Sequence, residues 1–341
     1  MRWTPGRRIR RRAWKKLLDI QNLTIRFDTD NGCVHAVNDL TLTLHEGETL
    51  GIVGETGAGK TTLARGIMGL VPQPAGKVVS GSIIYQDQDL LTFDNKQMQG
   101  IRGKHISMIF QDPMTSLNPV TPVGDQIAEA ILSHERITKK EAYRKAGDML
   151  RTVGIQPERA SDYPHQFSGG MKQRVIIAIA LVCNPKILIA DEPTTALDVT
   201  IQAQVLDTIR DLREKLDMSM LLITHDLGIV AQNCEQVAVM YAGEVVEYAD
   251  VYTIFADRRH PYTQGLFDSI PKLNEDVERL VPIEGLMPDP TDLPEGCKFC
   301  TRCKYAAERC AVEHPQMYDV GNGHTVRCFL AEEREKGGAE A

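Results

Sequence analysis

The sequence lacks a long hydrophobic run. Its longest unbroken apolar stretch has nine residues, from Val175 to Cys183, whereas a helix that spans a membrane needs about 20. We therefore predict that the chain does not cross a bilayer on its own. It has 341 residues, of which 42% are hydrophobic and 25% charged. This is the composition of an ordinary folded protein with room for two domains.

Acidic residues are missing from positions 1–16. This arm instead holds eight basic residues: Arg2, Arg7, Arg8, Arg10, Arg11, Arg12, Lys15 and Lys16. The remaining 325 residues hold 31 basic and 46 acidic ones, a net charge of −15. Asp19 and Gln21 follow the arm in place of an apolar segment, so we predict no secretory signal and a cytoplasmic protein. The arm, with Trp3 and Trp14, would suit anionic lipid or nucleic acid, but a solvated extension is the commoner outcome.

Cysteine is distributed unevenly. Cys33, Cys183 and Cys234 are scattered, and such residues are most often small buried thiols. The other five of the eight lie within 32 residues near the C-terminus: Cys297, Cys300, Cys303, Cys310 and Cys328. Because a cytoplasmic protein keeps its thiols reduced, this cluster predicts a metal site rather than disulfides.

Apolar and polar residues alternate over residues 18–25 and 40–44, which predicts two antiparallel strands. A more buried strand is predicted over 49–53, with a glycine-rich turn after it and a helix over 60–68. Further along, short apolar runs adjoin helical patterns. This alternation of strand and helix favours a parallel sheet with helices against it. The runs are 186–190 and 220–224, and the helical patterns are 201–216 and 227–232.

The segment from about residue 100 to 165 has a different character. It has helical patterns over 123–134 and 139–153 and few strand patterns, so we predict an inserted helical subdomain. After residue 250, six prolines within 34 residues exclude long helices and central strands. This region predicts a separate module built on turns and cysteines.

A phosphate-binding pattern follows the strand predicted over 49–53. Glycines let the backbone curl so that its N–H groups point at phosphates, and the helix that follows adds a favourable dipole. Lys60 supplies a positive charge and the Thr61 hydroxyl a ligand for Mg²⁺. The pattern G-x-x-x-x-G-K-[ST] is formed by Gly54, Glu55, Thr56, Gly57, Ala58, Gly59, Lys60 and Thr61, with Thr62 next to it. We predict that these nine residues bind a nucleotide.

Two carboxylates end the apolar run at 186–190. Asp191 is predicted to hold Mg²⁺, and Glu192 to orient and polarise the water that attacks the nucleotide. A strand that ends in a solvated acidic turn is the alternative for this pair in isolation. The phosphate-binding pattern upstream favours metal-assisted hydrolysis.

Together with four further motifs and one aromatic residue, these residues closely resemble the ATP-binding cassette (ABC) ATPases over residues 17–250. Phe167 to Arg174 resembles the signature motif of that family. The remaining matches are to the Q-loop, the D-loop, the switch histidine and the aromatic residue that stacks on adenine. They lie in the segments Phe110 to Pro113 with Gln111, Ala196 to Asp198, Ile223 to Asp226 with His225, and at Phe27.

The resemblance implies a mechanism. ATP would be sandwiched between two cassettes arranged head to tail, with Ser168, Gly169 and Gly170 contacting the nucleotide that the partner holds. Asp198 would lie in the same interface, and Gln111 would sense both Mg²⁺ and the attacking water. Catalysis would then fall to Glu192, His225 and Gln111, with Mg²⁺ held by Thr61, Asp191 and Gln111.

The C-terminal third resembles the oligopeptide/dipeptide importer ATPases, a group that includes nickel importers. The resemblance rests on Arg259 to Leu266, Ser269 to Pro271, Gly296 to Phe299 and the cysteines. It implies a second, usually non-identical ATPase subunit, two membrane permeases and an extracytoplasmic binding protein, with this chain at the cytoplasmic face of the membrane. Short peptides are the favoured cargo, and nickel or another small solute is the alternative.

Two other functions fit the sequence less well. A DNA-repair type ABC ATPase would explain the basic arm, but the acidic body suits DNA phosphates poorly, so we predict no nucleic-acid partner. A cassette that has lost hydrolysis is disfavoured because Glu192 and His225 are both present.

The cysteines leave two ligand sets open. Members of the importer group typically have cysteines corresponding to Cys297, Cys303, Cys310 and Cys328, and some hold an iron–sulfur cluster. The competing set exchanges Cys328 for Cys300, and its spacing departs from the ferredoxin pattern. We favour the first set and a [4Fe–4S] cluster over Zn²⁺, although four thiolates suit either metal centre.

These predictions combine into one architecture. The fold class is an α/β P-loop NTPase, with a RecA-like core, an antiparallel β subdomain and an inserted helical subdomain, followed by a small cysteine-rich module. The expected domains are the basic arm (1–16), the ABC ATPase domain (17–255, with its helical subdomain at about 100–165) and the C-terminal module (256–341).

Overall fold

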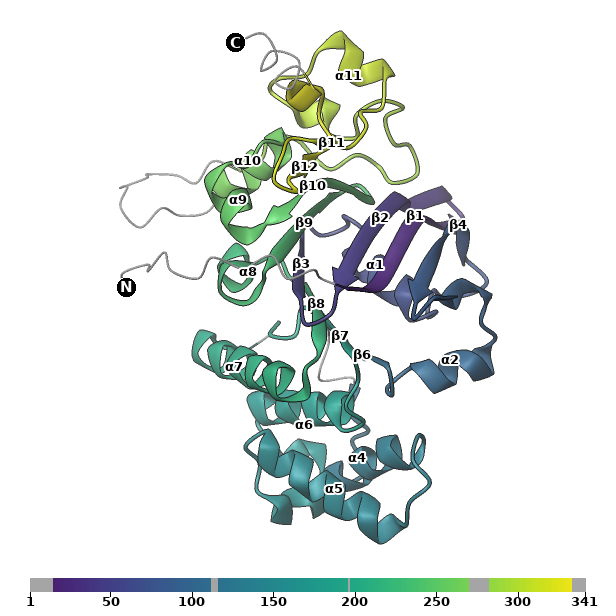
Figure 1. Cartoon of the computed structure of the whole chain (residues 1–341), viewed down its shortest axis with the longest axis vertical. Helices are drawn as coiled ribbons and strands as arrows, with labels where there is room; N and C mark the ends of the chain where they lie inside the picture. Colours follow the sequence, from purple (N-terminus) through teal and green to yellow (C-terminus); the bar gives the residue numbers. More distant parts are fainter. Residues whose placement is uncertain (1–14, 112–115, 196, 270–281, 333–341) are drawn as a thin grey trace.

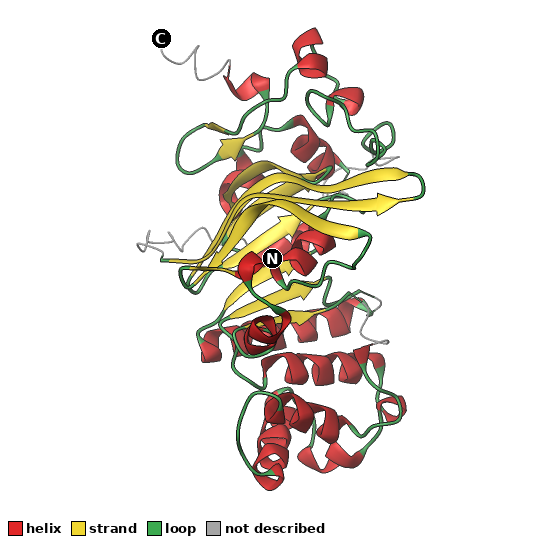
Figure 2. Ribbon diagram, turned by 90° about the vertical axis from the view of Figure 1, so that its right-hand side faces the viewer, coloured by secondary structure: helices red, strands yellow, loops and turns green. Residues whose placement is uncertain are grey.

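The computed structural model describes residues 15–111, 116–195, 197–269 and 282–332. Two sheets lie at the middle of an elongated molecule, with a group of helices below them and the C-terminal residues above them (Figure 1). Figure 2 shows the strands of the two sheets stacked between these two ends. Most of residues 1–16, including Trp3 and Trp14, lie outside the described part.

The first sheet is antiparallel and has four strands in the order β2-β1-β4-β5. Leu18 lies opposite Leu44, and Ile20 opposite Leu42, and all four side chains are buried. The two antiparallel strands predicted from the alternating pattern are therefore present and are longer than predicted. The bounds are β1 (Lys16–Thr29), β2 (Gly32–His45), β4 (Gly76–Tyr85) and β5 (Gln88–Asp89).

The second sheet is mixed and has eight strands in the order β11-β12-β10-β9-β3-β8-β7-β6. Strands β9, β3, β8, β7 and β6 run parallel, whereas β10, β12 and β11 pair antiparallel. The predicted parallel sheet is confirmed. The bounds are β3 (Thr49–Val53), β6 (Ile106–Ile109), β7 (Ile187–Asp191), β8 (Ser219–Ile223), β9 (Gln236–Tyr241), β10 (Glu244–Asp250), β11 (Tyr318–Asp319) and β12 (Thr325–Val326).

The helices begin at residues suited to cap them. Thr138 and Glu141 form a reciprocal capping box at the start of α5, and Asp226 accepts two backbone N–H groups at the start of α8. The α-helices are α1 (Lys60–Ile67), α2 (Asn95–Ile101), α4 (Val123–Leu132), α5 (Lys139–Thr152), α6 (Gly169–Leu181), α7 (Val199–Leu216), α8 (Leu227–Asn233), α9 (Val251–Ala256), α10 (Pro261–Asp268) and α11 (Glu308–Val312). Short 3₁₀ turns are η1 (Leu90–Thr92), η2 (Pro157–Ser161), η3 (Pro164–Gln166) and η4 (Cys300–Arg302).

Two hydrophobic cores lie on the two faces of the mixed sheet. In β7, Ile187 and Ile189 face the core shared with the antiparallel sheet and α1, while Leu188 faces the core shared with the helices. Successive side chains of a strand point to opposite faces, so a strand covered on both sides reads as a continuous apolar run. This is why the sequence showed no alternation here.

The segment predicted as helical, about residues 100–165, begins with a strand of the main sheet. Ile106–Ile109 form β6, which pairs in parallel with β7. The helical packing starts later, with α4 and α5 against each other and against α6. A four-residue buried strand carries too short a pattern to distinguish it from a helix.

The C-terminal residues are joined to the mixed sheet. Thr325 and Val326 of β12 pair with β10, which itself pairs with β9. Tyr262 and Phe299 belong to the same core cluster as α4 to α8. Part of this segment therefore continues the sheet and core of the preceding residues.

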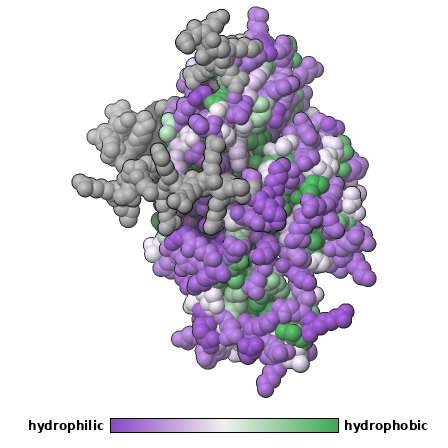
Figure 3. All heavy atoms as spheres, in the orientation of Figure 1, coloured by the Kyte–Doolittle hydropathy of each residue, from purple (hydrophilic) through white to green (hydrophobic). Residues whose placement is uncertain are grey.

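Within the described ranges, no helix is both long and apolar enough to span a membrane. Figure 3 shows a face covered mainly by hydrophilic residues, with smaller hydrophobic patches among them.

Candidate active site

The phosphate-binding pattern forms the loop between β3 and α1. Gly54, Gly57 and Gly59 have φ values of 155°, 88° and 97°, a region that residues with a side chain rarely adopt. A Cβ atom at Gly54 would collide with the carbonyl oxygen of Met240, and one at Gly59 with that of Ala36. Gly54 and Gly59 require glycine because the loop packs directly on neighbouring backbone at these two positions.

Lys60 lies at the start of α1, and its side chain is directed back into the loop. Its Nζ donates to the carbonyl oxygens of Gly54 (2.7 Å) and Glu55 (2.9 Å). Burial lowers the pKa of Lys60, while the nearby carboxylates of Glu192, Asp191 and Glu55 oppose that shift. The loop thus carries a cation with acidic groups close to it.

Asp191 ends β7 with a carboxylate that is 1% exposed. Among the described residues, neither of its oxygens has a hydrogen-bond partner. Burial raises its pKa, and the neighbouring Thr61 hydroxyl counteracts that effect. A buried carboxylate with unsatisfied oxygens beside a threonine hydroxyl fits a hard divalent cation such as Mg²⁺.

Glu192 is the point at which three sequence motifs meet. Its Oε2 accepts from Gln111 Nε2 (3.1 Å) and from the Thr195 hydroxyl (2.9 Å), and its Oε1 lies 3.2 Å from His225 Nδ1. Burial raises the pKa of Glu192, but the bonds from His225 and Thr195 outweigh it and lower the pKa overall. The carboxylate is held ionised, as a proton acceptor must be.

The backbone at Glu192 is unusual as well. Its φ is 47°, in the left-handed region, which costs a residue with a side chain about 1–2 kcal/mol. The turn directs Glu192 away from the strand so that its side chain reaches the Gln111 and His225 side chains. Such strain is found where the surrounding contacts fix a functional side chain.

The signature residues lie at the start of α6. Ser168 caps this helix by accepting from the Met171 N–H at 3.4 Å, and a Cβ atom at Gly170 would collide with Ile201 of α7. Ser168 and Gly169 are exposed, and none of the hydrogen bonds between described residues joins them to the phosphate loop. Asp198 caps α7 by accepting from Ile201 N–H at 3.0 Å.

Three of the motif segments are only partly described. Asp112 and Pro113 after Gln111, and Ala196 before Asp198, lie outside the described residues, as do Ile270 and Pro271. Phe27 is half-buried on β1, opposite Gly76 of β4, and its ring packs over that glycine. Its predicted contact with adenine stays a prediction.

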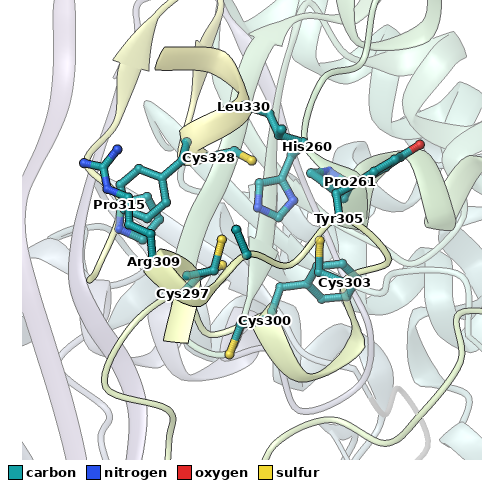
Figure 4. A pocket seen from close by; sticks show the side chains of 14 residues that line it. His260, Pro261, Cys297, Cys300, Cys303, Tyr305, Arg309, Pro315, Cys328 and Leu330 are labelled. Carbon is teal, nitrogen blue, oxygen red and sulfur yellow. The ribbon is translucent and has the colours of Figure 1, made fainter. Parts of the chain in front are cut away.

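Five cysteines line one pocket in the C-terminal segment. Figure 4 shows the sulfurs of Cys297, Cys303 and Cys328 around a common space, with the sulfur of Cys300 turned away from those of Cys297 and Cys328. Cys310 lines the same pocket. Burial raises the pKa of Cys297 to about 12 and that of Cys328 to about 11. Across the described ranges, no three His, Cys, Asp or Glu side chains are arranged as a ready metal site.

Three contacts of the site are not predicted by the sequence motifs. Thr195 bonds Glu192, the Glu55 N–H donates to the Tyr262 hydroxyl at 2.8 Å, and Arg302 forms a two-pronged ion pair with Glu55. Thr195 follows the acidic pair closely and could have been found by its position. Arg302 lies 247 residues from Glu55, a separation that no local pattern reveals.

A phosphate loop between a central parallel strand and a helix, with an acidic pair at the end of a second strand, defines the class of P-loop NTPases. A family model described as "ABC transporter" matches residues 37–195. The solved structure of the ATP-binding cassette MJ0796 bound to ADP and Pi has a TM-score of 0.62 and 26% identity, and covers 69% of this chain and 99% of that chain.

A second model, described as "Oligopeptide/dipeptide transporter, C-terminal region", matches residues 246–310. The dipeptide transport ATP-binding protein DppD of Bacillus subtilis is 49% identical over 94% of this chain and 96% of that protein. The oligopeptide transport protein OppD of the same organism is 50% identical over 92% of this chain and 89% of that protein. DppD of Escherichia coli is 45% identical, over 92% of this chain and 96% of that protein. The chain belongs to the family of ATP-binding subunits of oligopeptide/dipeptide ABC transporters.

Proposed function

We propose that this chain hydrolyses ATP to power the uptake of dipeptides or oligopeptides through a membrane transporter. ATP hydrolysis is the activity of its class, and the peptide cargo is supported by the functions of the three relatives named above, which are dipeptide and oligopeptide transport ATP-binding proteins. The observation that carries the proposal is the meeting of Gln111, Thr195 and His225 at the Glu192 carboxylate. This arrangement equips one group to take a proton from water.

The position of each residue in the site indicates its role in ATP hydrolysis. The loop N–H groups and Lys60 would bind the phosphates, and Thr61 and Asp191 would hold Mg²⁺. The metal, when bound, neutralises phosphate charge. Glu192 would orient a water and accept its proton as the water oxygen bonds the γ-phosphorus and the bond to the ADP oxygen breaks. Gln111 and His225 would hold that carboxylate in place.

The second half of the ATP site would come from a partner cassette. Ser168 and Gly169 are exposed at a helix start, where a hydroxyl and free N–H groups suit an anion. We propose that they, with Gly170, contact the nucleotide held by the partner and that Asp198 lies in this interface. Closure on ATP and opening after hydrolysis would then drive the transporter.

The membrane partners are proposed from the family. They are two permeases, an extracytoplasmic binding protein and a second ATPase subunit, which we propose to be a non-identical paralogue. The chain would act at the cytoplasmic face of the membrane. Nickel or another small solute is the alternative cargo. Uptake of radiolabelled dipeptide and of ⁶³Ni²⁺ into cells with and without the gene separates the two, because only one uptake should depend on this chain.

Replacing Glu192 by Gln tests the enzymatic assignment. The amide cannot accept the proton, so we expect steady-state ATP hydrolysis to fall by about 100-fold or more, while ATP binding and ATP-dependent dimer formation persist. Phosphate release and size-exclusion chromatography measure the two effects. Turnover that stays at the wild-type rate would contradict the role of Glu192.

We also propose that residues 256–341 form a cysteine-rich module in which Cys297, Cys303, Cys310 and Cys328 bind a [4Fe–4S] cluster or, as the alternative, Zn²⁺. The proposal is supported by the five thiols that share one pocket and by the orientation of Cys300 (Figure 4). Ligation would require the four thiols to lose their protons and to converge. Iron, sulfide and zinc measured on anaerobically purified protein decide it, since a protein with neither metal contradicts the site.

A further inference from the structure

Arg302 connects the C-terminal segment to the phosphate loop. Its Nη1 donates to Glu55 Oε2 at 2.7 Å and its Nη2 to Glu55 Oε1 at 3.1 Å. The arginine side chain is 3% exposed and the glutamate side chain 30% exposed. A planar, two-pronged pair of this kind fixes both the position and the orientation of the carboxylate.

The guanidinium has its own support, separate from Glu55. Its Nε donates to the carbonyl oxygen of Glu284 at 3.0 Å, and Nη2 to that of Ile283 at 3.3 Å. The ring centroids of Tyr241 and Phe299 lie 5.8 and 5.9 Å from its central carbon. Removing the Glu55 charge would therefore leave Arg302 with other partners in place.

The backbone of Glu55 is held from the same side of the molecule. Its N–H donates to the hydroxyl of Tyr262, a fully buried residue of α10. The Tyr262 ring packs on Tyr241 and Phe299, with centroids 4.6 and 5.5 Å apart. The Glu55 carbonyl in turn accepts from Lys60. One residue thus joins the C-terminal segment to the lysine of the phosphate loop.

Glu55 places a negative charge in a loop that binds negatively charged phosphates. It lies in the same loop as the binding groups, since the carbonyl oxygen of Glu55 accepts from the Lys60 ammonium at 2.9 Å. Without a partner, the carboxylate would oppose the nucleotide, and a half-buried site screens this repulsion less than water does.

We infer that Arg302 is a positioning residue of the ATP site, which holds the Glu55 carboxylate and neutralises it so that the phosphate loop accepts nucleotide. The inference rests on nucleotide binding at this loop, but not on the identity of the transported solute. It makes residues 282–302 part of the nucleotide site of the same chain. Because Cys300 and Cys303 flank Arg302 in sequence, the cysteine-lined pocket is connected to the loop through this side chain.

Two substitutions that change the charge at this pair in opposite directions distinguish this role from a purely structural one. Arg302→Met leaves Glu55 unpaired and negative, so nucleotide affinity should fall on the order of tenfold. Glu55→Gln removes the negative charge and leaves a cation nearby, so affinity should stay equal or rise. A contact that served only folding would weaken binding, or leave it unchanged, in both variants.

The test uses the full-length chain and two measurements. Isothermal titration gives the Kd for MgADP, and steady-state assays give KM and kcat for MgATP. We expect Arg302→Met to raise Kd and KM about tenfold at an unchanged kcat, and the double variant with Glu55→Gln to return within about threefold of wild type. Arg151→Met removes an arginine of an exposed pair on α5 and is the matched control, with Kd unchanged.

The results separate a failure of the Arg302 role from a failure of the ATPase assignment. An unchanged Kd in Arg302→Met, or a double variant as weak as Arg302→Met, overturns the role of Arg302. If Arg302→Met does not fold, Glu55→Gln alone decides, because a clear loss of MgADP affinity in that variant overturns the charge argument. A wild-type chain that binds no MgADP contradicts the ATPase assignment itself.

Discussion

Glu247 on β10 offers a prediction whose size follows from the structure. Its side chain is fully buried and joins three separate segments. Oε1 accepts from the Arg259 N–H at 2.6 Å and lies 2.8 Å from His324 Nε2, while Oε2 accepts from the His260 N–H at 3.0 Å. The carboxylate thereby ties the start of α10, which carries Tyr262, to the main sheet.

Glu247→Gln keeps the shape but supplies only one acceptor oxygen. If the NH₂ group takes the place of Oε2, it faces the His260 N–H; if it takes the place of Oε1, it faces the Arg259 N–H and His324. In either orientation, at least one buried donor loses its acceptor. An unpaired buried donor costs about 1–3 kcal/mol, and the bonds that remain lose their charge-assisted strength. We expect a loss of about 2–4 kcal/mol of unfolding free energy, and a fall in Tm on the order of 5–10 °C.

Guanidinium chloride unfolding of the full chain, followed by circular dichroism, measures the change. Glu46→Gln is the control, because that carboxylate is half-exposed and pairs with Lys15 at the surface, where such a pair contributes about 0–1 kcal/mol. If Glu247→Gln loses no more stability than Glu46→Gln, then the three contacts do not fasten the C-terminal segment and the reasoning is wrong.

Three further predictions concern other parts of the molecule. Gly59→Ala should abolish MgATP binding in a titration, since its Cβ would collide with the Ala36 carbonyl oxygen at a φ of 97°; retained affinity would contradict this. Gln173→Ala removes the buried bond from Nε2 to the Pro193 carbonyl oxygen, 2.6 Å long, and should destabilise the chain by about 1–3 kcal/mol and lower kcat. Burial raises the pKa of Cys234 far above its usual range, so at pH 8 iodoacetamide should label it only after unfolding, as read by mass spectrometry; rapid labelling of the folded chain would refute its burial.

Much of the nucleotide-binding half could be predicted from the sequence because its signals are local. A glycine loop between an apolar strand and a helix depends on residues 49–68 alone, and Asp191 and Glu192 follow a recognisable buried strand. Strand β6 was not predicted because its four residues are all buried and so show no alternation of apolar and polar side chains. Strand β12, two residues long, is specified by its pairing with β10, which lies about 80 residues earlier.

The sequence by itself determined the class of protein and the order of its motifs, because the glycine loop and the alternation of strands and helices each depend on residues that are close together in the sequence. Only the tertiary structure decided which distant side chains meet. Gln111 and His225 reach Glu192 because they follow β6 and β8, which flank β7, and the carboxyl ends of parallel strands share one edge of the sheet. Arg302 reaches Glu55 because the C-terminal segment packs back over β9. Contacts of this kind depend on the path of the whole chain, and no local stretch of sequence predicts them.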